Sequence, residues 1–151
     1  MDHDGRMDRA VMTRRAEARL ADLSIYLGVG DAKLAPSTRP TFLKTGLTAE
    51  GIVQLEGDDG ALIFTYGCGG CSNDYETTLT IVYRDGEVLV AGYTYAWETR
   101  EAIGSCEIDY LTGEGVMTEG LDGAGVEIKE KFTPVKLEDW SEDKRPAACE
   151  I

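Results

Sequence analysis

The stretch TTLTIVYRDGEVLVAGYTY, residues 77–95, decides the expected fold. Its two halves, residues 77–83 and 87–95, are rich in β-branched and aromatic residues, which favour strands. Between them lies Arg84-Asp85-Gly86, and an Asp-Gly pair accepts the positive φ angles that tight hairpin turns require. The stretch therefore predicts an antiparallel β-hairpin.

Similar patterns continue on both sides of this hairpin. Upstream, residues 51–56 and 61–66 flank Gly57-Asp58-Asp59-Gly60, which predicts a second hairpin. Downstream, glycines separate three shorter candidate strands, at residues 105–111, 115–118 and 125–132. We therefore expect a β-hairpin region over residues 51–133.

The N-terminal part of the chain has a different pattern. Apolar residues recur there at steps of three and four, which predicts an amphipathic helix over residues 8–27; they are Val11, Met12, Ala16, Leu20, Leu23 and Leu27. Asp8 is a suitable N-cap and Gly28 a suitable C-terminal stop. The polar residues 1–7 are expected to be mobile.

Two stretches carry a weaker signal. Residues 28–50 have no clear period, and they contain either a short strand around residues 41–43 or a functional loop. In the tail, residues 134–151, one helical turn is expected at residues 137–140.

Together these patterns predict one domain, residues 1–151, of the α+β class. We expect an N-terminal helix packed on a curved, mainly antiparallel, meandering β-sheet of six or seven strands. A chain of 151 residues is long enough to bury a sizeable core.

The charge of the chain limits its partners. Residues 1–22 are electrically balanced, and the remainder carries the whole net charge of −13. Such a surface repels phosphate, so we expect neither nucleic-acid binding nor attraction to an anionic membrane. A cationic protein or envelope component is the partner that this charge favours, although acidity also serves solubility alone. No apolar run is long enough to enter a membrane.

Four cysteines, Cys68, Cys71, Cys106 and Cys149, allow three disulfide connectivities. We favour Cys68–Cys71, across a Gly-Gly turn, and Cys106–Cys149, which would tie the chain end to a central strand. Structural disulfides imply an oxidising compartment. The alternatives are a redox-active Cys68/Cys71 pair, a four-cysteine zinc site, and four reduced thiols in a cytoplasmic protein.

Catalytic chemistry finds little support. The single histidine, His3, lies in the polar N-terminal stretch, which argues against nucleophilic triads and most metal sites. The carboxylates at Glu98, Glu101, Glu107 and Asp109 are interpreted as the solvated side of a strand. We therefore predict no catalytic residue, no metal ligand and no cofactor.

One constellation suggests binding. Tyr93, Tyr95 and Trp97 alternate along one strand, with Leu89 and Ala91 on the same face. The opposite face would carry Val88, Val90, Gly92 and Thr94. This aromatic ladder is either part of the core or a recognition platform rimmed by Glu98 and Arg100. The predicted binding residues are Tyr93, Tyr95, Trp97 and Arg100.

Several stretches of residues 61–150 together resemble a group of uncharacterised small secreted or periplasmic proteins of proteobacteria. The stretches are Arg84-Asp85-Gly86, Ala91-Gly92-Tyr93-Thr94-Tyr95 with Trp97, Thr99 and Arg100, Gly104-Ser105-Cys106 with Ile108, Tyr110-Leu111-Thr112-Gly113 and Gly115, Leu137 with Asp139-Trp140-Ser141, and Arg145-Pro146 with Cys149. The group has no established activity, so the resemblance assigns no functional residue. It implies export, although the first 25 residues lack the apolar segment of a signal peptide.

These observations favour a non-enzymatic, periplasmic or secreted, binding or inhibitor-type module for a protein or envelope partner. The alternatives are a thiol-redox protein that uses Cys68 and Cys71, and a structural or assembly protein; a cytoplasmic location is the alternative to export.

Overall fold

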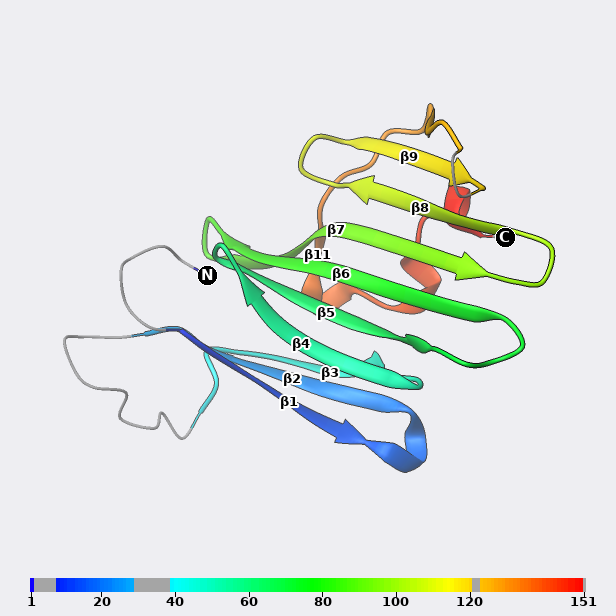
Figure 1. The fold of residues 1–151 in the computed structure, drawn as a ribbon. Helices are drawn as coiled ribbons and strands as arrows, with labels where there is room; N and C mark the ends of the chain where they lie inside the picture. The colour runs from blue at the N-terminus through cyan, green and yellow to red at the C-terminus, as the bar shows by residue number, and fades with distance from the viewer. Residues whose placement is uncertain (2–7, 29–38, 121–122, 151) are drawn as a thin grey trace.

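The computed structural model describes residue 1 and residues 8–28, 39–120 and 123–150. In these residues the regular structure is almost entirely β, arranged as an antiparallel sheet of three strands and another of eight (Figure 1). The helical segments there are 3-10 turns of three residues each. The antiparallel pairing is therefore confirmed, but the α+β class and the single sheet of six or seven strands are wrong. Most of the stretch 1–7, predicted to be mobile, lies outside the described residues.

The predicted helix over residues 8–27 is a β-hairpin. Strands β1 (Arg9–Arg15) and β2 (Leu20–Tyr26) pair antiparallel on either side of the short turn η1 (Ala16–Ala18). Arg19, with a φ of 51°, completes the reversal of the chain.

The physical reason lies in the neighbour of β2. Ala21, Leu23 and Ile25 alternate along β2 and are fully buried, so the sequence fits a period of two as well as a helical period. Strand β3 (Phe42–Thr48) pairs with the second edge of β2 and supplies backbone hydrogen-bond partners there. The stretch around residues 41–43, left open between strand and loop, is where β3 begins.

The eight-stranded sheet contains the remaining strands of the described residues. Its order is β10-β9-β8-β7-β6-β5-β4, and β11 pairs with the free part of β7. The strands are β4 (Ile52–Asp58), β5 (Ala61–Cys68), β6 (Asp74–Arg84), β7 (Glu87–Glu98), β8 (Ile103–Asp109), β9 (Glu114–Glu119), β10 (Val126–Glu127) and β11 (Val135–Lys136).

Both predicted hairpins are confirmed. Asp59-Gly60 joins β4 to β5 and Asp85-Gly86 joins β6 to β7, and all four residues have positive φ. Positive φ at both central residues gives the turn twist that matches the twist of paired strands. Of the downstream candidates, residues 125–132 form only the two-residue strand β10.

A β-bulge in β7 changes the expected facing of its side chains. Gly92 pairs with Thr80 and Val90 pairs with Ile81, which leaves Ala91 as an extra residue. An extra residue reverses the alternation beyond it. Val88 and Val90 therefore share a face with Tyr93, Tyr95 and Trp97, so the prediction of opposite faces is wrong.

The C-terminal segment, residues 134–150, covers one face of the large sheet, which we call the inner face; it runs behind the strands in Figure 1. It contains β11 and the 3-10 turns η2 (Leu137–Asp139), η3 (Glu142–Lys144) and η4 (Ala147–Cys149). Leu137 and Trp140 are buried, and the Trp140 ring lies 5.9 Å from that of Tyr93. The predicted helical turn at residues 137–140 thus corresponds to η2.

Both preferred disulfide pairings are present. Cys68–Cys71 closes the connection between β5 and β6, and Cys106–Cys149 ties β8 to η4. Cys106 and Cys149 are buried, whereas Cys71 is exposed. Two such pairs are compatible with an oxidising compartment.

The small sheet adjoins the β4 edge of the large sheet (Figure 1). The Arg14 guanidinium donates to the carbonyl of Gly51 at 2.9 Å, and Ala49 N–H donates to the carbonyl of Arg19. Gly51, with a φ of 62°, lies so close to Gly67 that a Cβ there would overlap the Gly67 carbonyl oxygen. Only glycine permits this approach of the two backbones.

Candidate binding pocket

A cavity of about 500 Å³ lies on the inner face of the large sheet, between that sheet and the C-terminal segment. Four tyrosines from β5, β6 and β7 line it: Tyr66, Tyr75, Tyr93 and Tyr95. The remaining lining residues are polar, and they are Thr48, Glu50, Thr77, Glu142, Asp143, Arg145 and Glu150. We call this cavity the tyrosine pocket.

Strand register explains why the tyrosines meet. Tyr66 pairs with Thr77, and Thr77 pairs with Tyr95, so these three side chains form one row across the inner face. Tyr75 and Tyr93 lie two residues from this row on their own strands and therefore project to the same side. Thr77 is small, which leaves space between its two tyrosine neighbours.

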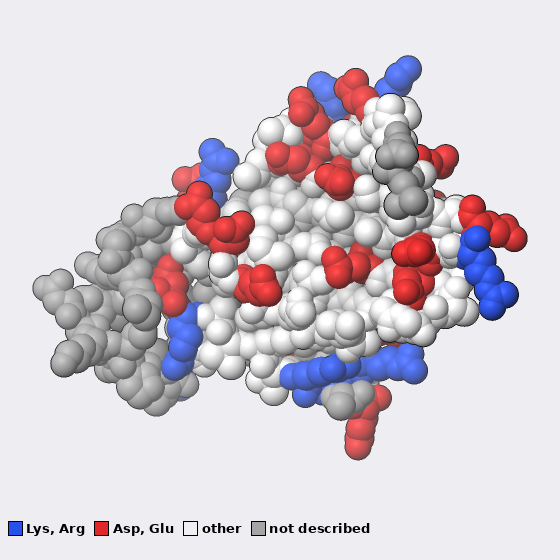
Figure 2. All heavy atoms as spheres, in the orientation of Figure 1, with Lys and Arg blue, Asp and Glu red and all other residues white. Residues whose placement is uncertain are grey.

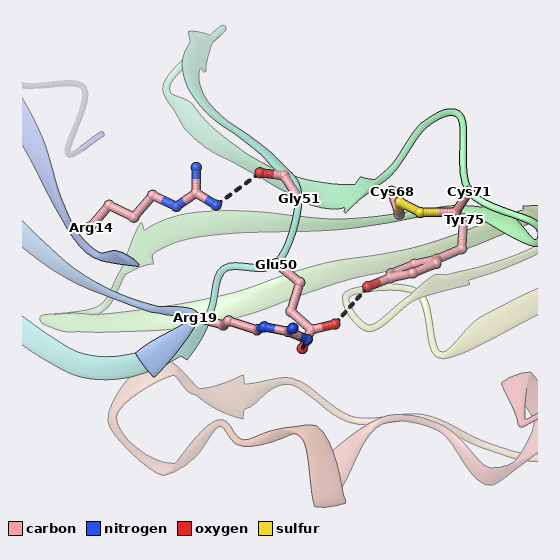
Figure 3. A network of polar contacts seen from close by, with 7 residues as sticks. All are labelled: Arg14, Arg19, Glu50, Gly51, Cys68, Cys71 and Tyr75. Carbon is pink, nitrogen blue, oxygen red and sulfur yellow. Dashed lines mark hydrogen bonds and ion pairs between the residues drawn. A yellow bond between two sulfur atoms is a disulfide. The ribbon is translucent and has the colours of Figure 1, made fainter. Parts of the chain in front are cut away.

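Two of the tyrosine hydroxyls are held by carboxylates. Tyr75 donates to Glu50 Oε2 at 2.8 Å, and Glu50 Oε1 accepts from Arg19 at 3.3 Å (Figure 3). Tyr66 donates to Glu142 Oε1. These contacts connect the small sheet and the C-terminal segment to the pocket.

The same contacts shift the pKa values of the groups involved. Burial, together with the hydrogen bond and negative charge of Glu50, raises the pKa of Tyr75 to about 12. The pKa of Tyr66 is raised by burial and by Glu142. The hydrogen bonds from Tyr75 and Arg19 lower the pKa of Glu50, so this carboxylate stays ionised.

The other two tyrosines leave their hydroxyls available. No hydrogen bond from Tyr93 or Tyr95 to another described residue is present, and burial raises the pKa of Tyr93. The Tyr95 ring lies 6.3 Å from that of Tyr75 and stacks on Trp97 at 5.8 Å, which fixes its orientation.

The four predicted binding residues separate in the structure. Tyr93 and Tyr95 line the tyrosine pocket. Trp97 is 9 % exposed, and its ring packs on Gly104, where a Cβ would overlap it. Arg100 lies in the exposed turn between β7 and β8 and does not reach the pocket.

Sequence reasoning missed most of the pocket wall. Tyr66 and Tyr75 stand in hairpin patterns that indicate a buried face, and this signal could have grouped them with Tyr95. Glu142 and Asp143 come from a tail without periodicity, so nothing in the sequence places them opposite the sheet.

The chemistry of the pocket suits a cation. Glu50 is paired with Arg19, and Glu150 with Arg145 at 3.4 Å. Glu142 and Asp143 have no basic partner among the described residues. Aromatic faces and unpaired carboxylates both attract ammonium and guanidinium groups.

Comparison with known proteins gives no relative: no family model, no curated protein and no solved structure matches the chain. In the part of the chain that the structure describes, no three His, Cys, Asp or Glu side chains are placed to hold a metal ion. No helix among the described residues is long and apolar enough to cross a bilayer.

Proposed function

We propose that this protein is a non-enzymatic binding module whose tyrosine pocket receives a cationic group of a protein or envelope partner. The observation that carries the proposal is the convergence of four tyrosines with the carboxylates of Glu142 and Asp143, which have no basic partner among the described residues. A net charge of −13 adds a long-range field that attracts such a partner.

The proposal places the protein in the periplasm or outside the cell. The two disulfides support this location, because they are compatible with an oxidising compartment. In that setting a lysine or arginine side chain of a basic envelope protein, hydrolase or toxin would enter the pocket.

Titration calorimetry with a tetralysine peptide tests the proposal, and the peptide with acetylated side chains is the neutral control. The measurement uses about 0.15 M salt, where the Debye length is only about 8 Å and diffuse attraction is largely screened. Saturable binding of tetralysine alone is expected.

Two variants test the site. Glu142→Gln keeps an acceptor for Tyr66 but removes a charge, so binding should weaken about tenfold, as expected for a charge-assisted hydrogen bond. Tyr95→Leu removes a π face and should weaken binding about three- to tenfold.

Glu114→Gln is the matched control, because it removes one charge from β9, away from the tyrosine pocket. If Glu114→Gln weakens binding as much as Glu142→Gln, only the overall charge matters and the pocket has no role. Equal binding of the acetylated peptide would refute the cationic ligand.

A thiol-redox function is the second candidate, because Cys71 is exposed and open to a reductant. The pair lies between two strands, however, without the strand-to-helix junction of thioredoxin-like sites. Insulin reduction that disappears in the Cys68→Ser/Cys71→Ser variant would support this candidate, and its absence in the native protein would end it.

A further inference from the structure

A second hollow, of about 330 Å³, lies on the opposite or outer face of the large sheet. Its walls are mainly apolar: Ile52 of β4, Ile103 of β8, and the start of the disulfide hairpin at Cys68 and Gly69. This face is turned toward the viewer in Figure 2, where acidic side chains lie over the sheet and basic ones lie at its margins. We call this cavity the outer hollow.

Small residues in strand register create the outer hollow. Gly67 of β5, Glu76 of β6 and Ala96 of β7 lie in one row across the sheet. Ala96 has only a methyl side chain, so the space on the β7 side of Glu76 stays open. On the other side, Gly67 lets the β6 backbone approach β5 closely, because a Cβ there would overlap the Tyr75 carbonyl oxygen. The volume of the outer hollow equals that of about eleven water molecules at ~30 Å³ each.

Three carboxylates line this otherwise apolar space. Asp74 lies directly opposite Glu98 in the β6–β7 ladder, and Glu76 is two residues further along β6. Like charges in directly opposed positions destabilise a sheet. No Lys, Arg or His is among the lining residues, and none of the three carboxylates has an ion-pair partner in the described part of the chain.

Asp74 also carries an unpaired acceptor. Its Oδ1 atom is buried and has no hydrogen-bond partner among the described residues. Burying an acceptor without a hydrogen-bond donor is unfavourable, and the cost is larger when the acceptor belongs to a charged group. A cation in the outer hollow would offset the negative charge of Asp74 through space, while the Oδ1 atom itself stays enclosed.

We infer that the outer hollow binds an organic ammonium ion with a compact apolar body. The ammonium group would lie beside the carboxylates of Asp74 and Glu98 and neutralise the repulsion between them, because an ammonium carries three donors and no acceptor. The apolar body would lie on Ile52, Ile103 and the wall formed by the Cys68–Cys71 hairpin. This site goes beyond the proposed function, since the tyrosine pocket is on the other face and is mostly polar.

The probe for this site is 2-phenylethylamine, and the neutral control is 2-phenylethanol, which has a similar body without the charge. Isotope-labelled protein is titrated with each compound, and backbone amide shifts report both affinity and location. We expect saturable binding of the amine, with shifts at residues 96–98 and 103–104, and at least tenfold weaker binding of the alcohol.

Two variants and two controls complete the test. Asp74→Asn should weaken amine binding at least tenfold, and Ala96→Leu should abolish it by filling the hollow. Glu114→Gln, which removes a charge elsewhere on the outer face, should leave it unchanged. Glu142→Gln weakens amine binding at the tyrosine pocket alone, so the shifts at residues 96–98 and 103–104 should persist in this variant.

Asp74→Asn also has a readout without ligand. Because the substitution removes one of two opposed charges, the melting temperature should rise or stay the same. Retention of amine binding in both Asp74→Asn and Ala96→Leu would overturn the inference. So would equal binding of the alcohol, or shifts confined to residues 142–150, although the last result would support the tyrosine pocket.

Discussion

Removal of the Cys106–Cys149 disulfide tests how the C-terminal segment is held. In the variant Cys106→Ala/Cys149→Ala, the covalent tie between β8 and η4 is lost. The segment that ends at η4 also supplies Glu142 and Arg145 to the tyrosine pocket, so the tie affects both stability and binding.

The magnitude follows from the loop that each disulfide closes. Cys106 and Cys149 are 43 residues apart, and the chain-entropy model gives about 4 kcal/mol for a loop of that length. Cys68 and Cys71 are three residues apart, which gives only about 2 kcal/mol. For a chain of this size 1 kcal/mol corresponds to about 2–4 °C, so the expected losses in melting temperature are about 8–16 °C and about 4–8 °C.

Thermal unfolding of both double-alanine variants, followed by tryptophan fluorescence, provides the comparison. Trp140 is in the C-terminal segment and Trp97 is in β7, so the signal reports on both parts. If the loss of Cys106–Cys149 costs no more than the loss of Cys68–Cys71, the loop-entropy reasoning is refuted. Weaker tetralysine binding is expected only for Cys106→Ala/Cys149→Ala.

Three further predictions concern backbone packing beside β4, the attachment of the C-terminal segment and the titration of the tyrosines. Gly51→Ala should destabilise the fold by about 3 kcal/mol, because its Cβ would overlap Gly67. Gly46→Ala is also at positive φ but has open space around it, so it should cost about 1 kcal/mol. Equal losses in thermal unfolding followed by circular dichroism would contradict this. Lys44 donates to the carbonyls of Trp140 and Glu138 at 2.6 and 2.8 Å, so Lys44→Met should cost about 1–2 kcal/mol in urea unfolding. An unchanged unfolding midpoint would show that these two hydrogen bonds do not stabilise the fold. Tyrosine absorbance should reveal at least four late-titrating phenols, because burial raises the pKa values of Tyr66, Tyr75 and Tyr93 in the tyrosine pocket and of Tyr110 outside it. Stability should decline above pH 10 and through about pH 12, because the raised pKa values favour the protonated form in the folded state. Titration of all seven tyrosines near pH 10 in folded protein would contradict the burial of these four phenols.

The hairpins were predictable because their signal is local. Asp59-Gly60 and Asp85-Gly86 set the turn geometry within two residues, and the flanking alternation needs no distant partner. The disulfide pairing was also accessible, because Cys68–Cys71 spans one short turn and leaves one other pair.

The error over residues 8–27 has a physical cause. Leu20, Leu23 and Leu27 fit a helical spacing, while Ala21, Leu23 and Ile25 fit a strand, and local sequence does not separate the two. The backbone of β3 decides, because its N–H and C=O groups pair with those of β2.

The bulge at Ala91 is also determined by tertiary packing and not by local sequence. An ideal strand would place Val90 and Tyr93 on opposite faces, but burying both on the inner face is favourable because each adds apolar area to the core. The extra residue makes this possible, and it also brings Tyr93 and Tyr95 into the tyrosine pocket.

The sequence by itself determined the antiparallel hairpins and the acidic surface, because each depends on neighbouring residues or on composition, and it favoured the cysteine pairing that the structure contains. Only the tertiary structure decided that the N-terminal stretch is a hairpin, that β7 is bulged, and that Glu142 meets Tyr66. These last features join residues far apart in the chain, and packing and backbone pairing across that distance leave no periodic trace in sequence.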